Sequence, residues 1–202
     1  MLPNIALALY GLLGFIGIAS ASPSLLGNYT VVDVQWDLPT NLSDPNSATI
    51  SVLGTIQEAV AQMEAQYPGW NATFQNQQPS NATVSTVAQY DVEGYLCGKP
   101  WSWVGYYAVL DGIYYLRKVT SAAPKNGPGP GNCGRVSCGY KAAIYWCNDN
   151  GAEKELDSWN DIADGAQYVF DKCVDRDDKY AMVAGQVFYT DKWNVIVTFE
   201  SC

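Results

Sequence analysis

The chain has 202 residues, of which 48% are hydrophobic and 13% aromatic, a composition that supports a packed core and argues against disorder. It contains no histidine, which excludes a Ser-His-Asp triad, a Cys-His pair and a histidine-ligated zinc site. Its formal net charge of −9 argues against nucleic acids and anionic membrane surfaces as partners. We therefore expect a globular acidic protein without imidazole chemistry and without a cofactor.

The N-terminus has the pattern of a secretory signal peptide. Residues 1–18 are apolar and uncharged, and the small residues 19–21 fit a cleavage site. The apolar run is shorter than the ~20 residues that a membrane-spanning helix needs, and no basic residues flank it. We interpret residues 1–21 as a signal peptide and expect a secreted, extracellular protein with no transmembrane segment.

Cysteines and glycosylation sequons agree with this route. An even number of cysteines suits three disulfides in an oxidising compartment. They are Cys97, Cys133, Cys138, Cys147, Cys173 and Cys202. The Asn-X-Ser/Thr sequons place N-glycans on Asn28, Asn41, Asn71 and Asn81. Four sequons behind a signal peptide indicate a eukaryotic glycoprotein.

Charge, sequons and cysteines divide the chain into two unlike parts. Residues 22–98 hold seven acidic residues and no Lys or Arg, whereas all eleven basic residues lie in 99–202 beside thirteen acidic ones. Every sequon precedes residue 84 and every cysteine follows residue 96. We expect an acidic, N-glycosylated subdomain or prosegment over 22–94 and a disulfide-stapled α+β domain over 95–202.

The N-terminal part is predicted to be a small β-α-β unit. The β-branched stretch 29–36 predicts a strand, and a second strand is expected over 82–92. Between them, a helix is expected to start at a cap, Thr49 or Ser51, and to end at Pro68-Gly69. Its apolar positions recur at helical spacing at Leu53, Ile56, Val60 and Met63.

The C-terminal part predicts an antiparallel sheet packed against helices, an α/β sandwich. Its elements, in chain order, are a helix over 102–119, a Gly-Pro loop over 126–132, a strand over 139–148, a helix from Ser158 to Cys173, and a hairpin of 184–189 and 193–199.

The strand GYKAAIYWC at 139–147, the helix ending at Cys173 and the closing segment 185–202 resemble the fungal virally encoded killer toxins of the α/β-sandwich type. These are small secreted disulfide proteins, and calcium-channel-blocking toxin-like proteins occur among their fungal relatives. The resemblance covers residues 95–202. It implies a non-enzymatic toxin-like or effector-like protein that binds an extracellular or cell-surface target.

The resemblance also implies one of the 15 possible pairings of six cysteines. The final cysteine would bridge to the central strand as Cys138–Cys202, and the helix-closing cysteine to the first as Cys97–Cys173. The remaining pair is Cys133–Cys147, whose 15-residue loop would contribute about 3 kcal/mol.

Toxin activity in this family is associated with a basic residue just before the central-strand cysteine. In this chain Val136 stands two positions before Cys138, and Arg135 stands one further back. The resemblance therefore makes Arg135 a candidate binding residue, although this chain lacks the basic charge balance of the toxins.

An aromatic cluster near the start of the C-terminal part gives the other candidate binding residues. It has too many rings for one buried helix face, so some are expected to be exposed or covered by the N-terminal part. Exposed rings could stack on sugars, and burial between the two parts is the alternative. The cluster comprises Trp101, Trp103, Tyr106, Tyr107, Tyr114 and Tyr115.

Carboxylates are the only acid/base groups that a glycosidase could use here. We interpret them as a solvated acidic surface, and the run 175–178 as a polar turn that lacks the ligand spacing of a calcium loop. The carboxylates are Glu153, Glu155, Asp157, Asp161, Asp164 and Asp171. We expect no metal site and no enzyme; the alternatives are a protein that binds cell-wall polysaccharide through aromatics and a carboxylate-dependent glycosidase.

Overall fold

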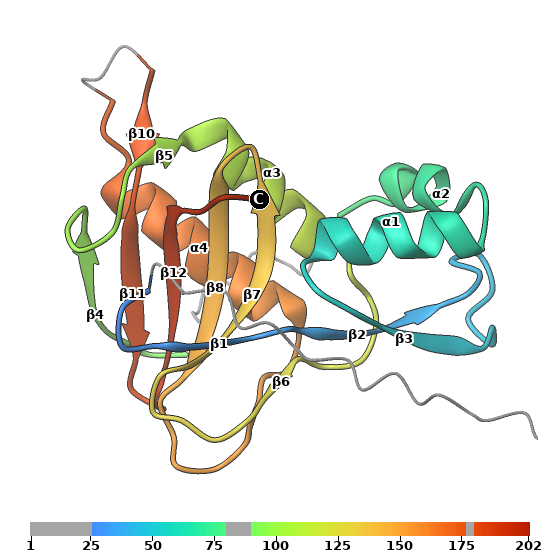
Figure 1. Cartoon of the computed structure of the whole chain (residues 1–202), viewed down its shortest axis with the longest axis horizontal. Helices are drawn as coiled ribbons and strands as arrows, with labels where there is room; N and C mark the ends of the chain where they lie inside the picture. Colours follow the sequence, from blue (N-terminus) through green and yellow to red (C-terminus); the bar gives the residue numbers. More distant parts are fainter. Residues whose placement is uncertain (1–25, 80–89, 177–179) are drawn as a thin grey trace, which may run out of the picture.

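The computed structural model describes residues 26–79, 90–176 and 180–202 and has the predicted α+β architecture (Figure 1). Its main sheet is mixed rather than wholly antiparallel. In spatial order its strands are β1 (Thr30–Val32), β7 (Asn132–Gly139), β8 (Ala142–Asn148), β12 (Trp193–Phe199), β11 (Gly185–Tyr189) and β4 (Val92–Cys97). The predicted signal peptide, Asn81 and most of the predicted strand over 82–92 lie outside the described residues.

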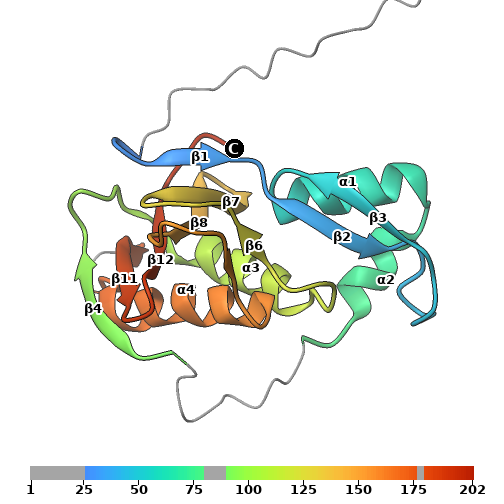
Figure 2. The same cartoon turned by 90° about the horizontal axis from the view of Figure 1, so that it is seen from below.

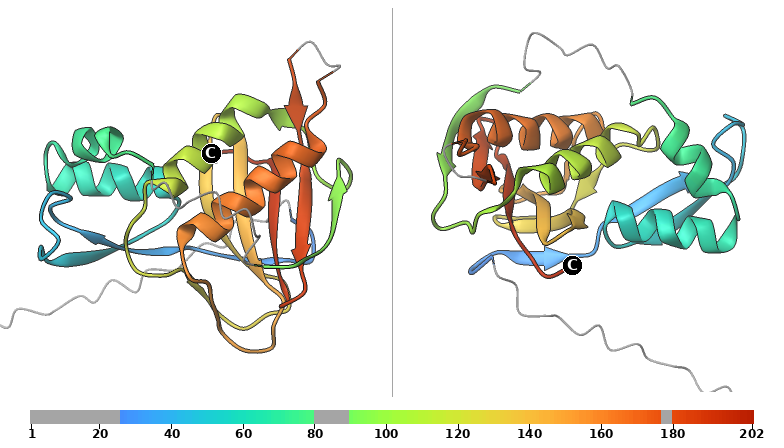
Figure 3. Two further views of the ribbon diagram at one scale, coloured as in Figure 1. Left: turned by 180° about the vertical axis from the view of Figure 1, so that it is seen from behind. Right: turned by 90° about the horizontal axis from the view of Figure 1, so that it is seen from above.

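Helices α3 (Tyr106–Arg117) and α4 (Trp159–Cys173) cover one face of this sheet (Figure 3). The prediction for α4 is confirmed: the N–H of Ser158 donates to the Asp161 carboxylate at 2.8 Å, one half of a capping box. The buried side of α4 packs against β11 and β12 through Ile162, Ala166 and Val169. This apolar stripe holds the helix on the sheet.

The β11–β12 hairpin is also confirmed, and Lys192 in its turn adopts a left-handed φ of 65°. The predicted strand over 139–148 begins only at β8, because Tyr140 and Lys141 form the preceding turn with positive φ. The predicted helix over 102–119 begins at Tyr106, because β5 (Val104–Gly105) pairs with β10 (Met182–Val183) instead.

Strand β7 is absent from the predicted order. Its sequence NCGRVSCG carries two glycines and no clear alternation, and a bulge between Arg135 and Ser137 interrupts its pairing with β8. It follows the Gly-Pro loop, which is a loop as expected except that Asn126 ends β6 (Lys125–Asn126) and Asn132 begins β7. Strand β6 pairs with β9 (Lys154–Glu155), which lies further along the chain. The β7 segment is a strand despite its weak pattern because it lies between β1 and β8 and pairs with both.

The N-terminal part is β-β-β-α-α rather than β-α-β. The predicted strand over 29–36 is two strands, β1 and β2 (Gln35–Pro39), and β2 pairs with β3 (Thr49–Leu53). The expected caps Thr49 and Ser51 therefore lie in a strand. Instead Thr55 caps α1 (Ile56–Gln66), which ends before Pro68-Gly69 as predicted, and α2 (Trp70–Asn76) follows. Leu53 is 54% exposed and is not a core position of the helix.

The first strand of the N-terminal part belongs to the main sheet. β1 runs parallel to β7, on the side of the molecule opposite α4 (Figure 2). This parallel pair makes the sheet mixed. An N-terminal segment thereby supplies one edge of the sheet on which the C-terminal cysteines lie.

The two parts share one hydrophobic core. Trp36 of β2 is fully buried and stacks on Trp159 of α4, with ring centroids 3.9 Å apart. Val34 packs so closely on β7 that a Cβ at Gly134 would lie 2.7 Å from its Cγ2 atom. Because both contacts join segments more than 90 residues apart, residues 26–79 are integrated into the fold.

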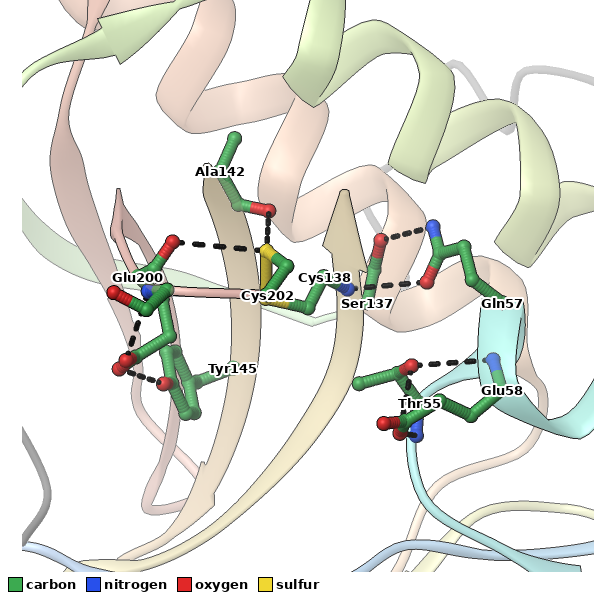
Figure 4. The surroundings of a disulfide bond; sticks show 10 residues. Thr55, Gln57, Glu58, Ser137, Cys138, Ala142, Tyr145, Glu200 and Cys202 are labelled. Carbon is green, nitrogen blue, oxygen red and sulfur yellow. Dashed lines mark hydrogen bonds between the residues drawn. A yellow bond between two sulfur atoms is a disulfide. The ribbon is translucent and has the colours of Figure 1, made fainter. Parts of the chain in front are cut away.

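Helix α1 is tied to β7 by one glutamine (Figure 4). The Gln57 amide donates to the Ser137 hydroxyl at 2.9 Å and accepts from the Cys138 N–H at 3.0 Å. These two hydrogen bonds give partners to polar groups of β7 just after its bulge, where the hydrogen-bonded pairing with β8 is interrupted. The contact holds the strand that carries the Cys138–Cys202 disulfide.

Three disulfides staple the C-terminal part, and no described cysteine is free. They join Cys97 to Cys173, Cys133 to Cys147 and Cys138 to Cys202. These are the three pairs that the killer-toxin resemblance implies. They fix β4 to the end of α4, β7 to β8, and the C-terminal tail to β7.

Candidate functional site

The predicted aromatic cluster is divided between the core and the surface. Trp101 is buried, and its indole N–H donates to the Gln186 side chain at 3.2 Å. The Tyr115 hydroxyl accepts from the Gln75 amide at 2.8 Å, and its ring packs against Phe74 of α2. Trp101 is therefore buried, and Tyr115 is half-buried against the N-terminal part.

The remaining rings reach the surface around α3. Tyr107 is 73% exposed, Trp103 42% and Tyr114 41%, whereas Tyr106 is half-buried. Tyr107 and Tyr114 are seven residues apart and lie on one side of α3, about 10.5 Å apart along its axis at 1.5 Å per residue. The opposite side is buried through Val109, Gly112, Ile113 and Leu116.

Close packing of α3 on the sheet determines which side of the helix faces solvent. A Cβ at Gly112 would lie 2.6 Å from the Ser137 hydroxyl and 3.0 Å from Ile144, so only glycine allows this approach. Because Gly112 faces β7 and β8, the residues on the far side of the helix are turned outward (Figure 3). Tyr107, Asp111 and Tyr114 occupy that side, and we name these three residues the α3 ridge.

Each exposed ring is supported on one side. The Tyr106 ring backs Tyr107, with centroids 3.9 Å apart. The Lys118 ammonium lies 4.0 Å from the centroid of Tyr114. Trp103 lies against Gly98, where a Cβ would be only 3.1 Å from the indole. Such support restricts ring motion, so a ligand that stacks on the other side loses less conformational entropy.

Lys118 is 1% exposed, and buried partners hold its charge in place. Its ammonium donates to the backbone carbonyl and the side-chain oxygen of Gln75, which closes α2 onto the end of α3. Buried cations need such partners, and the Tyr114 ring supplies a further one. The N-terminal part therefore positions one end of the α3 ridge.

Asp111 lies between the two tyrosines of the ridge, four residues after Tyr107 and three before Tyr114. Partial burial raises the pKa of its carboxyl, and the Lys118 charge opposes that rise. Within the described residues, the Asp111 carboxylate makes no hydrogen bond and no ion pair. A partly desolvated acceptor between two exposed rings is a plausible ligand group, and the sequence patterns did not single it out.

Replacing Asp111 with Asn is expected to stabilise the protein slightly. A raised carboxyl pKa means that the folded state disfavours the charged form, so the charge costs stability at neutral pH. The gain should stay within about 0.5 kcal/mol, the range of surface substitutions. Thermal melts at pH 7 and pH 3 measure it: the difference should vanish at pH 3, where Asp111 is protonated. A lower Tm for Asp111→Asn at pH 7 would contradict this account.

A mostly apolar depression of ≈680 Å³ lies beside Trp103, lined by residues 99–103. It brings Trp103 and the edge of Trp101 together with Lys99. The structure thus places Trp101 and Trp103 in one loop but gives them different roles: Trp101 anchors the loop, and Trp103 faces its open side.

Arg135 does not belong to the α3 ridge. It lies on β7 opposite Tyr145 in β8, on the sheet face that points away from α3. The Tyr145 hydroxyl donates to the Glu200 carboxylate at 2.8 Å, and burial raises the pKa of Tyr145 (Figure 4). Arg135 is half-buried and interacts with Tyr145. The structure therefore separates Arg135 from Tyr106 and Tyr107 of α3, whereas Trp101 belongs to the buried cluster on the sheet face that carries Tyr145.

Most of the predicted acidic residues lie on the surface as expected, but Asp161 is buried, contrary to the prediction. Asp164 pairs with Arg117 at 2.6 Å and Glu155 with Lys125 at 3.2 Å, while Asp161 caps α4. Glu153, Asp157 and Asp171 are exposed. Residues 26–79, 90–176 and 180–202 contain no group of three potential metal ligands, and Asp177 and Asp178 lie outside these ranges.

Of the predicted glycosylation sites that the structure describes, two are exposed and Asn71 is half-buried. Asn28 and Asn41 are exposed. Asn71 lies in α2, where its side-chain oxygen accepts from Gln75 at 3.2 Å.

No family model, curated protein or solved structure matches this chain. Among the described residues, no helix has the length and apolar composition needed to cross a bilayer. The protein is therefore described by its own features: a disulfide-bonded α+β fold with a ridge of supported aromatic rings on α3.

Proposed function

We propose that the protein is a secreted, non-enzymatic glycoprotein that acts outside the cell by binding a target, in the manner of killer-toxin-like or effector-like proteins. Three disulfides, the signal-peptide pattern and the sequons support the extracellular location. The α3 ridge and Trp103 form the binding surface in this proposal.

The observation that carries the proposal is the exposure of supported aromatic rings. Aromatic side chains are enriched at binding surfaces because they bring large contact area at low entropic cost. Tyr107, Tyr114 and Trp103 are each supported on one side and accessible on the other. Exposed rings of this kind cost solubility, and a binding role accounts for them.

In this proposal, Arg135 has a structural role. The resemblance to killer toxins points to a basic binding residue, but Arg135 is half-buried beside Tyr145 on the other face of the sheet. The two assignments can be separated because Arg135 and the α3 ridge lie on opposite sides of one sheet.

The test is binding of the secreted, full-length protein to intact fungal cells and to plant tissue. Tyr107→Ala should reduce binding at least tenfold, whereas Arg135→Ala should not change it once its folding is verified by circular dichroism. Tyr140→Ala is the control, because Tyr140 is an exposed tyrosine (84%) in the β7–β8 turn and is not part of α3. Loss of binding in Arg135→Ala but not in Tyr107→Ala would overturn the assigned surface.

A further inference from the structure

We infer that the α3 ridge binds a neutral, extended, β-1,4-linked glycan along the helix axis. This inference rests on the proposed function and names the chemical class of the target. It depends on four observations: the spacing of Tyr107 and Tyr114, their supported rings, an Asp111 carboxylate that has no hydrogen bond or ion pair to the described residues, and the charge of the protein.

The spacing of the two tyrosines fits alternate sugar rings. Tyr107 and Tyr114 are separated by two helical turns, about 10.5 Å along α3. In an extended β-1,4-linked chain, each hexose advances by about half of this length, and every second ring presents the same face. Two tyrosines on one side of a helix would therefore meet the first and third rings of a trisaccharide.

The exposed rings suit the apolar faces of sugars. The C–H bonds on one face of a β-linked hexose carry partial positive charge and pack against the negative face of an aromatic ring. Tyr106 and Lys118 occupy the inner sides of the two ridge tyrosines, which leaves a single side of each for a ligand. A flat polymer is the shape that can contact both rings at once.

Asp111 would bind the sugar between the two stacked rings. An ionised carboxylate only accepts hydrogen bonds, and sugar hydroxyls are donors that it can satisfy. Asp111 lies between Tyr107 and Tyr114 on the same side of α3, and within the described residues nothing else occupies its carboxylate. The middle ring of a trisaccharide would supply the missing hydroxyl donors.

Charge selects neutral glycans over acidic ones. The protein carries a net charge of −9, and a uronic acid beside Asp111 would place two carboxylates together. The Lys118 ammonium favours the charged form of Asp111 and so reduces this repulsion, but it is buried against Gln75 and Tyr114 and makes no ion pair with Asp111 within the described residues. Neutral glucose or N-acetylglucosamine polymers meet no such penalty.

The experiment is a calorimetric titration of the full-length secreted protein with cello- and chito-oligosaccharides of two to six units. Affinity should rise sharply from the disaccharide to the trisaccharide and then level off. Tyr107→Ala and Tyr114→Ala should each weaken trisaccharide binding about tenfold. Tyr107→Phe and Tyr114→Phe should retain it, because the ring rather than the hydroxyl makes the contact. Asp111→Asn should weaken binding without loss of fold, and Tyr140→Ala should leave it unchanged.

The outcomes separate this inference from the proposed function. If Tyr107→Ala abolishes cell binding but no oligosaccharide binds the wild type, the glycan assignment is wrong and the binding surface stands. If oligosaccharides bind as expected but cell binding is unaffected in Tyr107→Ala, the ridge is a glycan site and the proposed cellular target lies elsewhere. Stronger binding of oligogalacturonate or of a basic peptide than of the neutral oligomers would overturn the inference.

Discussion

Replacing Trp36 with Ala is expected to lower the free energy of unfolding by about 3–5 kcal/mol, the usual cost of removing a large buried aromatic side chain. Trp36 is fully buried, stacks on Trp159 at 3.9 Å and donates its indole N–H to the Gly54 carbonyl at 2.8 Å. The substitution leaves a cavity between β2 and α4. Urea denaturation followed by far-UV circular dichroism measures the loss.

The matched control is Leu53→Ala, in the same β2–β3 hairpin. Leu53 is 54% exposed, so its truncation should cost no more than about 0.5 kcal/mol. A loss for Trp36→Ala as small as that for Leu53→Ala would mean that the N-terminal part contributes little to the common core.

The same measurement bears on whether residues 22–94 are a removable prosegment. With a shared core, wild type should unfold in one cooperative transition, and Trp36→Ala should shift the whole transition. A fragment 95–202 would expose Trp159 and leave β7 without β1 and Gln57. Two separate transitions, or a fragment as stable as the full chain, would favour a detachable N-terminal part.

Strong hydrophobic periodicity in the sequence correctly predicted the helix and the hairpin that bury their apolar side chains against the core. Helix α4 and the β11–β12 hairpin lie where their apolar positions place them. These segments carry their signal locally, since a helical stripe or an alternating strand needs only its own sequence to be read.

The missed elements depend on long-range partners. β7 is a strand because β1 and β8 pair with its two sides, and no pattern within its eight residues shows this. β3 was expected to be the start of a helix because Leu53 continues the apolar spacing of α1. Pairing with β2 overrides that spacing, and the helix starts after Thr55 instead.

In the candidate site, too, the sequence shows the local pattern but not what depends on long-range packing. The aromatic cluster was evident in the sequence, but which rings are exposed depends on α2 and on the packing of Gly112. Asp111 could have been found from its position four residues after Tyr107 and three before Tyr114 once the helix was drawn as a wheel. That its carboxylate makes no hydrogen bond or ion pair to any described residue is a property of the folded protein alone.

Removal of the Cys97–Cys173 disulfide by the double substitution Cys97→Ala/Cys173→Ala should cost about 4.5 kcal/mol on the chain-entropy estimate, because the bridge spans 76 residues. It also ties β4, an edge strand of the sheet paired only with β11, to the end of α4. Urea denaturation should show a lower midpoint, and hydrogen exchange should show early opening of β4.

The comparison variant is Cys133→Ala/Cys147→Ala, whose bridge spans 14 residues and should cost about 3 kcal/mol by the same estimate. These two cysteines lie opposite each other in the β7–β8 ladder and are fully buried, so a packing loss adds to the entropic one. A larger loss for this short bridge than for Cys97–Cys173 would mean that packing of the sulfurs within the sheet, rather than restriction of the unfolded chain, governs what the disulfides contribute. A larger loss for the long bridge would mean that the C-terminal part is stabilised chiefly by tying its sequence-distant edge strand to α4.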